Sequence, residues 1–344
     1  MIIIFLIVSI IILIIIHELG HFSAAKLMRV RVDEFGVGFP PKIFGKKFGE
    51  TEYSVNAVPL GGFVRLYGEA GFADGEAITE KERSFSFQPA SKRVLILAAG
   101  VVMNFILGWL ILTAVFWIGS KPRLFVTAVS PESPAAIAGF QNGDVLADFA
   151  KAADFINYVD AHRGELVSFR VIREDAAATP VMIQAVPRVQ PPADEGALGV
   201  GISELGIERL GFWNGLWTGL KRSGIIFGAI FAALGGLVKD LFSGGGVPEG
   251  IVGPVGIYAI ASETSRFGYL YLLQIMAVIS LNLAALNVLP IPALDGGRLL
   301  FIAIEKIKGS PVKRARENLS HLIGFLVVIA LMIAITARDV INFL

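Results

Sequence analysis

Cysteine is absent from this chain of 344 residues. Its absence excludes disulfide bonds and thiolate–metal sites, so any bound metal ion must be held by histidine and carboxylate side chains. Charge is also scarce, because 17% of the residues are charged, against about 25% in a typical soluble domain. A formal net charge of +1 argues against binding of nucleic acid or another polyanion. Hydrophobic residues make up 54% of the chain, which indicates a membrane protein.

Long apolar runs divide the sequence into membrane and soluble parts. The four runs are Ile2 to about Met28, Val94–Ile118, Phe267–Leu294 and the shorter Leu322–Ala337. The second run has no charged residue and is long enough to cross a hydrocarbon core of about 30 Å. Residues 212–241 are apolar too, but they contain several glycines and three basic residues, so their relation to the membrane is ambiguous.

Nearly unbroken apolar residues, Ile2–Ile16, lead into His17-Glu18-Leu19-Gly20-His21, an H-E-x-x-H sequence within the first run. Residues four apart share one face of a helix, so His17 and His21 can bind one zinc ion while Glu18 projects beside it. Ionisable groups at membrane depth are costly and usually functional, which favours zinc chemistry over a structural role. A secretory signal peptide ending near Ala25 is the alternative, but it would lack a positively charged start and contain this polar cluster.

A carboxylate at the end of the third run is the candidate third zinc ligand. Two prolines interrupt the helix pattern just before Asp295, and Gly296 and Gly297 follow it. Two histidines and one aspartate leave a fourth position open for water, as catalytic zinc sites do. Asn282 and Asn287 are candidates for binding substrate, although hydrogen bonding between helices would explain them equally well.

Basic residues predict the orientation of the runs. The segment between the first two runs and the loop before the last run are both rich in Lys and Arg, so both should face the cytoplasm. Four crossings then place both termini and the soluble domain outside. Residues 212–241 would lie in the interface or re-enter from outside; we favour this over a full crossing, because it brings Asp295 to the same side as His17.

Together these motifs resemble the site-2 protease family of intramembrane zinc metalloproteases, in particular its bacterial branch of the regulator of sigma-E protease type. The matching motifs are H-E-L-G-H at residues 17–21, N-x-x-P-x-x-x-L-D-G-G at 287–297, G-V-G-F-P at 36–40 and P-L-G-G-F-V at 59–64. The resemblance implies that His17, His21 and Asp295 bind zinc, that Glu18 is the general base, and that residues 35–67 form a membrane-associated β-hairpin near the site. Gly61 and Gly62 in this region are candidate substrate-binding residues. The second run departs from the family pattern, since Val101 follows Gly100 where proline is common.

The soluble part resembles a PDZ domain. Residues 126–129 and 166–172 are expected as strands, residues 133–136 precede a short helix, and Gly143-Asp144 is a turn. A β-rich spacer is the alternative. The expected fold is therefore a polytopic α-helical membrane protein of about four spans, with a β-hairpin region and one extracytoplasmic PDZ-like α+β domain. Its parts are residues 1–118 with the first two spans, 119–190 with the PDZ-like domain, 205–245 with interfacial helices, and 250–344 with the last two spans.

These features predict an enzyme of a bacterial inner membrane that uses zinc to cleave the transmembrane segments of single-span proteins, such as an anti-sigma factor or a signal-peptide remnant. A non-catalytic membrane adaptor with a degenerate metal site is the main alternative, but such an adaptor would not need Glu18. An ion or metal transporter is a third class, and it would not be expected to combine H-E-x-x-H with a PDZ-like domain.

Overall fold

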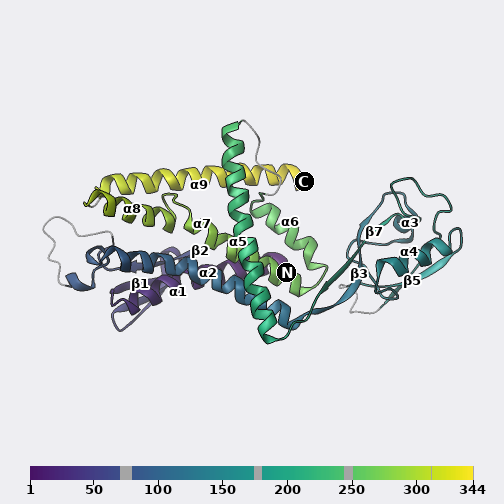
Figure 1. The fold of residues 1–344 in the computed structure, drawn as a ribbon, viewed down its shortest axis with the longest axis horizontal. Helices are drawn as coiled ribbons and strands as arrows, with labels where there is room; N and C mark the ends of the chain where they lie inside the picture. The colour runs from purple at the N-terminus through teal and green to yellow at the C-terminus, as the bar shows by residue number, and fades with distance from the viewer. Residues whose placement is uncertain (70–79, 174–179, 244–250, 311, 344) are drawn as a thin grey trace. The chain divides into compact units, whose positions relative to one another are not determined.

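The computed structural model describes residues 1–69, 80–173, 180–243, 251–310 and 312–343. Among them, five helices are long and apolar enough to cross a membrane. They are α1 (Ile2–Leu27), α2 (Ala90–Ile118), α5 (Phe212–Ser243), α7 (Tyr269–Val288) and α9 (Arg314–Phe343). The chain is therefore a polytopic membrane protein with additional β-sheets (Figure 1).

Helix α1 is rich in isoleucine, which is not a strong helix former in water. In hydrocarbon the balance changes, because every backbone N–H and C=O must find a partner within the segment, and a helix provides one. The apolar runs predicted from the sequence accordingly become helices. The exception is the third run, whose helix α7 ends at Val288, ahead of the two prolines.

Helices α6 (Pro254–Ser265) and α8 (Asp295–Lys308) were not predicted from the sequence. Helix α6 precedes α7, and α8 occupies most of the segment expected to be a loop before the last span. Helix α8 forms because one of its faces is apolar: Ile302 is buried in a cluster with residues of α1 and α2. Gly309 in the left-handed conformation ends the helix, and Lys306 and Lys308 lie in its last turn, where cations are favourable.

The described residues form two compact units. The first comprises residues 1–112, 219–259 and 274–344, and it contains the motifs at residues 17–21, 36–40, 59–64 and 287–297. The second comprises residues 113–218 and 260–273.

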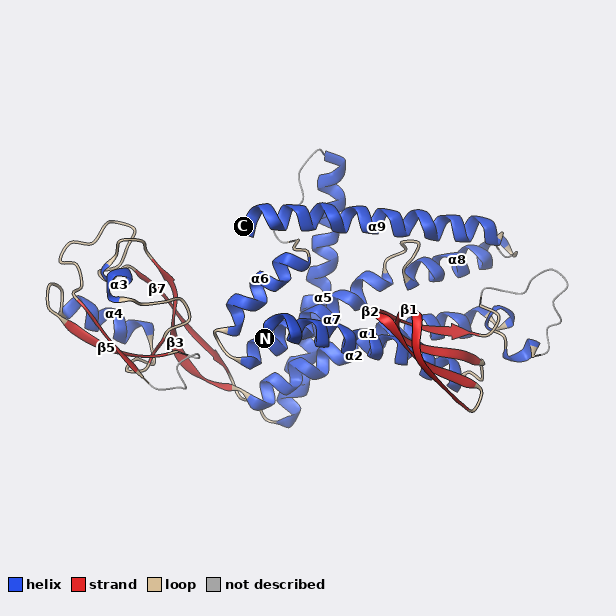
Figure 2. Ribbon diagram, turned by 180° about the vertical axis from the view of Figure 1, so that it is seen from behind, coloured by secondary structure: helices blue, strands red, loops and turns tan. Residues whose placement is uncertain are grey.

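Strands β1 (Val32–Phe48) and β2 (Thr51–Leu66) form a sheet beside α1 in the first unit (Figure 2). Both strands are long and fold back on themselves, as their pairing shows. Val37 of β1 pairs with both Gly62 and Val55 of β2, and Val55 also pairs with Phe44 of β1. Four strand segments therefore lie next to one another, and residues 62–66 form one of the two outer segments. The β-hairpin region predicted for residues 35–67 is thus a small sheet with an open edge. Two short 3₁₀ helices, Lys81–Arg83 and Phe85–Phe87, lead from it to α2.

A five-stranded sheet with the strand order β6-β5-β4-β3-β7 forms the second unit. Its elements are β3 (Ser120–Val129), α3 (Pro134–Ala138), β4 (Val145–Leu146), α4 (Ala152–Ala161), β5 (Val167–Ile172), β6 (Val181–Ala185) and β7 (Val200–Ile207). Alternate residues of β5 are buried, and Phe169 and Val171 contribute to the core of this unit. Strand β3 contains the strand predicted at residues 126–129, and β5 covers the strand predicted at 166–172 except for its first residue.

The predicted end of the soluble domain at residue 190 is too early. Strand β7 begins at Val200 and pairs with β3, so it completes the sheet from beyond that boundary. Pairing between strands so distant in sequence depends on tertiary contacts and has no local signature. The boundaries predicted at residues 245 and 250 lie outside the described residues.

Candidate metal centre

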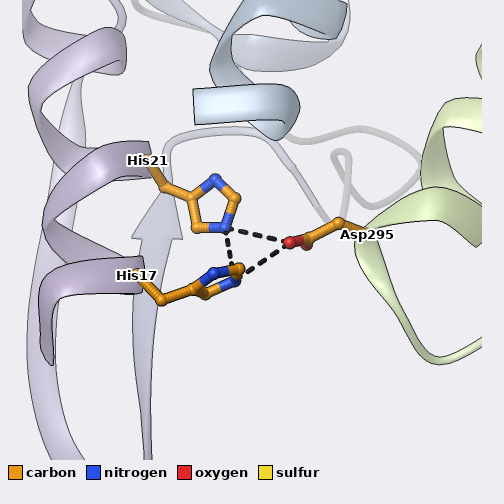
Figure 3. Close-up of side chains that lie close together, drawn as sticks. All are labelled: His17, His21 and Asp295. Atoms are coloured by element: carbon orange, nitrogen blue, oxygen red, sulfur yellow. Dashed lines mark hydrogen bonds and ion pairs between the residues drawn. The ribbon is translucent and has the colours of Figure 1, made fainter. Parts of the chain in front are cut away.

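Three side chains from α1 and α8 converge on one point (Figure 3). The Nε2 atoms of His17 and His21 lie 3.0 and 3.2 Å from Oδ2 of Asp295, and 3.1 Å from each other. Within the described residues, this is the group of histidine and carboxylate side chains whose donor atoms are close enough to hold one metal ion. The structure therefore brings together the three residues predicted as ligands.

Hydrogen bonding shows that these atoms suit a cation. Nδ1 of His21 lies 2.9 Å from the carbonyl oxygen of Ile96, and a carbonyl only accepts, so Nδ1 carries the proton. In the neutral ring the lone pair of Nε2 then points toward the carboxylate of Asp295, whose buried Oδ2 has no hydrogen-bond donor. Two electron-rich atoms face each other without a proton between them, and a bound zinc ion would satisfy both.

Asn104 on α2 supports His17. Its Nδ2 lies 3.4 Å from Nδ1 of His17, and its Oδ1 is buried without a partner. With the amide oxygen turned toward His17, Oδ1 accepts the proton of Nδ1 across the same 3.4 Å. That proton position leaves Nε2 of His17 free to bind metal. Asn104 was not among the residues predicted from the sequence, although a polar residue in a charge-free span was a usable indication.

A cavity of about 420 Å³ opens beside the three candidate ligands, and Glu18 lines it. Gly61 and Gly62 of β2 and Asn287 of α7 also line this cavity, as their proposed contact with substrate requires. A Cβ on Gly62 would lie 3.0 Å from Cγ of Glu18, so the outer strand segment approaches the candidate general base closely. Asn282 is not among the lining residues, and its role in binding substrate stays a prediction.

Two glycines allow α1 and α2 to approach each other at the site. A Cβ on Gly100 would lie 2.4 Å from Nε2 of His21 and 2.8 Å from Cε1 of His17. A Cβ on Gly20 would lie 2.5 Å from the backbone oxygen of Ala99. Real Cβ atoms do not occur at such distances, so both positions require glycine. Gly100 was noted in the sequence only as part of a motif, because the contact is between helices.

The two glycines after Asp295 have a similar role. A Cβ on Gly296 would lie 2.0 Å from the backbone oxygen of Leu289, and one on Gly297 would lie 2.4 Å from that of Ile291. The first turn of α8 therefore folds tightly against the end of α7. This fold places the carboxylate of Asp295 opposite the histidines of α1.

Ion pairs attach α8 to its neighbours. Arg93 on α2 donates two hydrogen bonds to Glu305, at 3.0 and 2.9 Å. Arg298, one turn after Asp295, pairs with Glu69, and this negative charge raises the pKa of Arg298 above its usual value. The guanidinium of Arg298 lines the cavity and stays charged at any physiological pH. Helix α8 is thus fixed to α2 and to the segment after β2.

Comparison with known proteins gives the family of this chain. The sequence profile of peptidase family M50 matches residues 5–331. The chain belongs to this family. It is 32% identical, over 99% of both chains, to a Clostridium perfringens protein that is named provisionally as a zinc metalloprotease. A Clostridium acetobutylicum protein with the same provisional name is 30% identical over 96% of this chain and 94% of its own. Zinc metalloprotease RasP of Geobacillus kaustophilus is 28% identical over 96% of each chain.

Proposed function

We propose that this protein is an intramembrane zinc metalloprotease that hydrolyses peptide bonds within the transmembrane segments of single-span membrane proteins. The observation that carries the proposal is the convergence of His17, His21 and Asp295 beside Glu18 at the end of an apolar helix. A membrane adaptor has no use for three ligands and a general base in one cavity. Membership in peptidase family M50 supports the same conclusion.

His17, His21 and Asp295 would hold the zinc ion, which would activate a water molecule and polarise the scissile carbonyl group. Glu18 accepts the proton of the attacking water as the water oxygen bonds to the carbonyl carbon. It then donates this proton to the amide nitrogen as the carbon–nitrogen bond breaks, so one water molecule is consumed for each bond cleaved. Asn104 keeps His17 in the tautomer that binds metal.

A helical substrate must unwind before it can be cut, because its amides are bonded to one another within the helix. The outer strand segment of β2, residues 62–66, offers replacement partners by strand addition. Its position supports this role, since Gly61, Gly62 and Val64 line the same cavity as Glu18. Gly61 and Gly62 leave the backbone accessible at the point where the scissile bond would lie.

Removal of the metal tests the proposed function. Purified protein in lipid vesicles should cleave a co-reconstituted single-span protein at a bond within its apolar segment, as located by mass spectrometry. A zinc chelator should stop this cleavage, and added zinc should restore it. A panel of single-span proteins that the zinc-loaded protein binds but never cleaves would favour the adaptor instead.

We further propose that the site opens toward the cytoplasm and that the second unit is a PDZ-like domain on the extracytoplasmic side of the membrane. The support is the basic character of the segment between the first two spans and of the segment before the last span. The sheet of the second unit has β7 at one edge, where an extended peptide can add. In this arrangement α5 lies in the interface or re-enters, and Phe212, Trp213 and Trp217 are the aromatic anchors at its start.

The natural absence of cysteine makes this topology simple to test. Single cysteines at Ala193 in the second unit and at Ser243 at the end of α5 should react with a membrane-impermeant thiol reagent added outside intact cells. A cysteine at Ser310, after α8, should react only after permeabilisation. Protection of Ser243→Cys until permeabilisation would show that α5 crosses the membrane, and it would contradict the proposed arrangement.

A further inference from the structure

The segment that carries Asp295 begins with a tight turn. The N–H of Leu294 donates to the carbonyl oxygen of Ile291 at 3.1 Å, which closes a four-residue β-turn. Pro292 stands at its second position, where its ring fixes φ near −65°. Ala293 at the third position has a φ of 86°. Proline followed by a positive φ defines a type II turn, in which the third residue is normally glycine.

Alanine at this position is strained, because its Cβ disfavours the left-handed region. The turn also leaves the N–H of Ala293 without a partner of its own, since its internal hydrogen bond uses the N–H of the fourth residue. Something outside the turn must therefore stabilise Ala293. The turn matters because Asp295 follows only two residues later.

His321 on α9 supplies the missing partner. Its Nδ1 accepts the N–H of Ala293 at 2.8 Å. A backbone N–H can only donate, so the proton of this imidazole must reside on Nε2, which lies 4.0 Å from Oε1 of Glu317. The ring of Phe301 on α8 packs against the imidazole, with ring centroids 5.5 Å apart. His321 is thus held between α8 and α9 with its acceptor directed at the turn.

A second contact confirms that α9 is shaped to meet this turn. A Cβ on Gly324, nearly one helical turn after His321, would lie 2.1 Å from the carbonyl oxygen of Pro292. Only glycine permits this approach. Helices α8 and α9 lie side by side in both views of the fold (Figures 1 and 2). The backbone of the turn therefore rests on α9 at Gly324 while His321 binds its free N–H.

We propose that His321 is a positioning residue for the metal centre: it holds Ala293 in its strained conformation and thereby fixes Asp295 against His17 and His21. It does not touch the metal itself. This inference rests on the proposed role of Asp295 as a zinc ligand. Residues that orient metal ligands without binding the metal typically contribute about 10- to 100-fold in metal affinity.

Two isosteres of histidine give the sharpest test. Asparagine places its Oδ1 near the position of Nδ1, whereas glutamine extends its oxygen toward the position of Nε2. Full-length protein in detergent should lose bound zinc to a competing chelator about tenfold more readily as His321→Leu or His321→Gln. His321→Asn should retain zinc within about threefold of the natural protein, because it keeps the acceptor.

Relief of the backbone strain at Ala293 provides a second test. Ala293→Gly removes the conformational penalty, so it should restore most of the zinc affinity lost in His321→Leu. Equal zinc affinity in His321→Asn and His321→Gln, or failure of Ala293→Gly to restore any affinity, would overturn the inference. If His321→Leu does not fold, the comparison of the two isosteres still decides.

Asp295→Ala separates this inference from the assignment on which it rests. If Asp295→Ala retains zinc as tightly as the natural protein, the proposed ligand set is wrong. If Asp295→Ala loses zinc while all three His321 variants retain it, the ligand set stands and only the positioning role of His321 is wrong.

Discussion

Replacing Glu18 by glutamine is expected to abolish cleavage while leaving the zinc content unchanged. Glutamine has the shape of glutamate but cannot take a proton from water, and general-base catalysis contributes about 10²- to 10⁴-fold to a rate. Glu18 lines the cavity beside the three ligands and is not one of them, so the metal should stay bound. The measurement is the cleavage rate in vesicles together with zinc per chain by elemental analysis.

Glu18→Asp is the matched variant, because it retains a carboxylate but withdraws it by one methylene group. It should keep a small fraction of the activity and a full zinc content. Substantial cleavage by Glu18→Gln would contradict the proposal that Glu18 is the general base. Loss of zinc from Glu18→Gln would instead mean that Glu18 binds the metal.

Adding a single methyl group at Gly100 is expected to destroy the metal centre. The new Cβ of Gly100→Ala would lie 2.4 Å from Nε2 of His21, the atom proposed to bind zinc, and 2.8 Å from Cε1 of His17. These imidazoles cannot move away without leaving Asp295, so zinc binding and cleavage should both fall by at least about a hundredfold.

Gly108→Ala on the same helix is the control. Its Cβ would contact the side chain of Leu281 at 2.8 Å and would touch neither histidine. This variant should lose some thermal stability through overpacking but retain its zinc. If Gly100→Ala binds zinc as tightly as Gly108→Ala does, the close packing of α1 and α2 at the ligands is wrong.

The sequence was sufficient for features whose cause is local. An apolar run of adequate length must be helical in hydrocarbon, and H-E-x-x-H within such a run puts two imidazoles on one face. The prolines and glycines around Asp295 likewise predicted a broken backbone beside a carboxylate. Helices α1 and α2 and the three candidate ligands could therefore be predicted from these local patterns alone.

Features that arise between elements could not be predicted in this way. Gly100 is essential only because α1 approaches it, and β7 joins a sheet from beyond the predicted domain boundary. Helix α8 looked like a loop because it is rich in charge, and it is helical because Ile302 and the Arg93–Glu305 pair fix it to its neighbours. His321, which lies next to the basic loop in sequence, gave no indication that it contacts the turn before Asp295.

X-ray absorption at the zinc edge of the purified protein tests the central claim most directly, because it identifies the ligands of the bound metal. The account predicts one zinc ion with two imidazole ligands and additional oxygen ligands, at about 2.0–2.2 Å. The spectrum of Asp295→Ala should show the same two imidazoles with fewer oxygen ligands. This variant should also bind zinc with lower affinity. Zinc bound by fewer than two imidazoles, or an identical oxygen shell in Asp295→Ala, would contradict the assignment of His17, His21 and Asp295 as the metal centre.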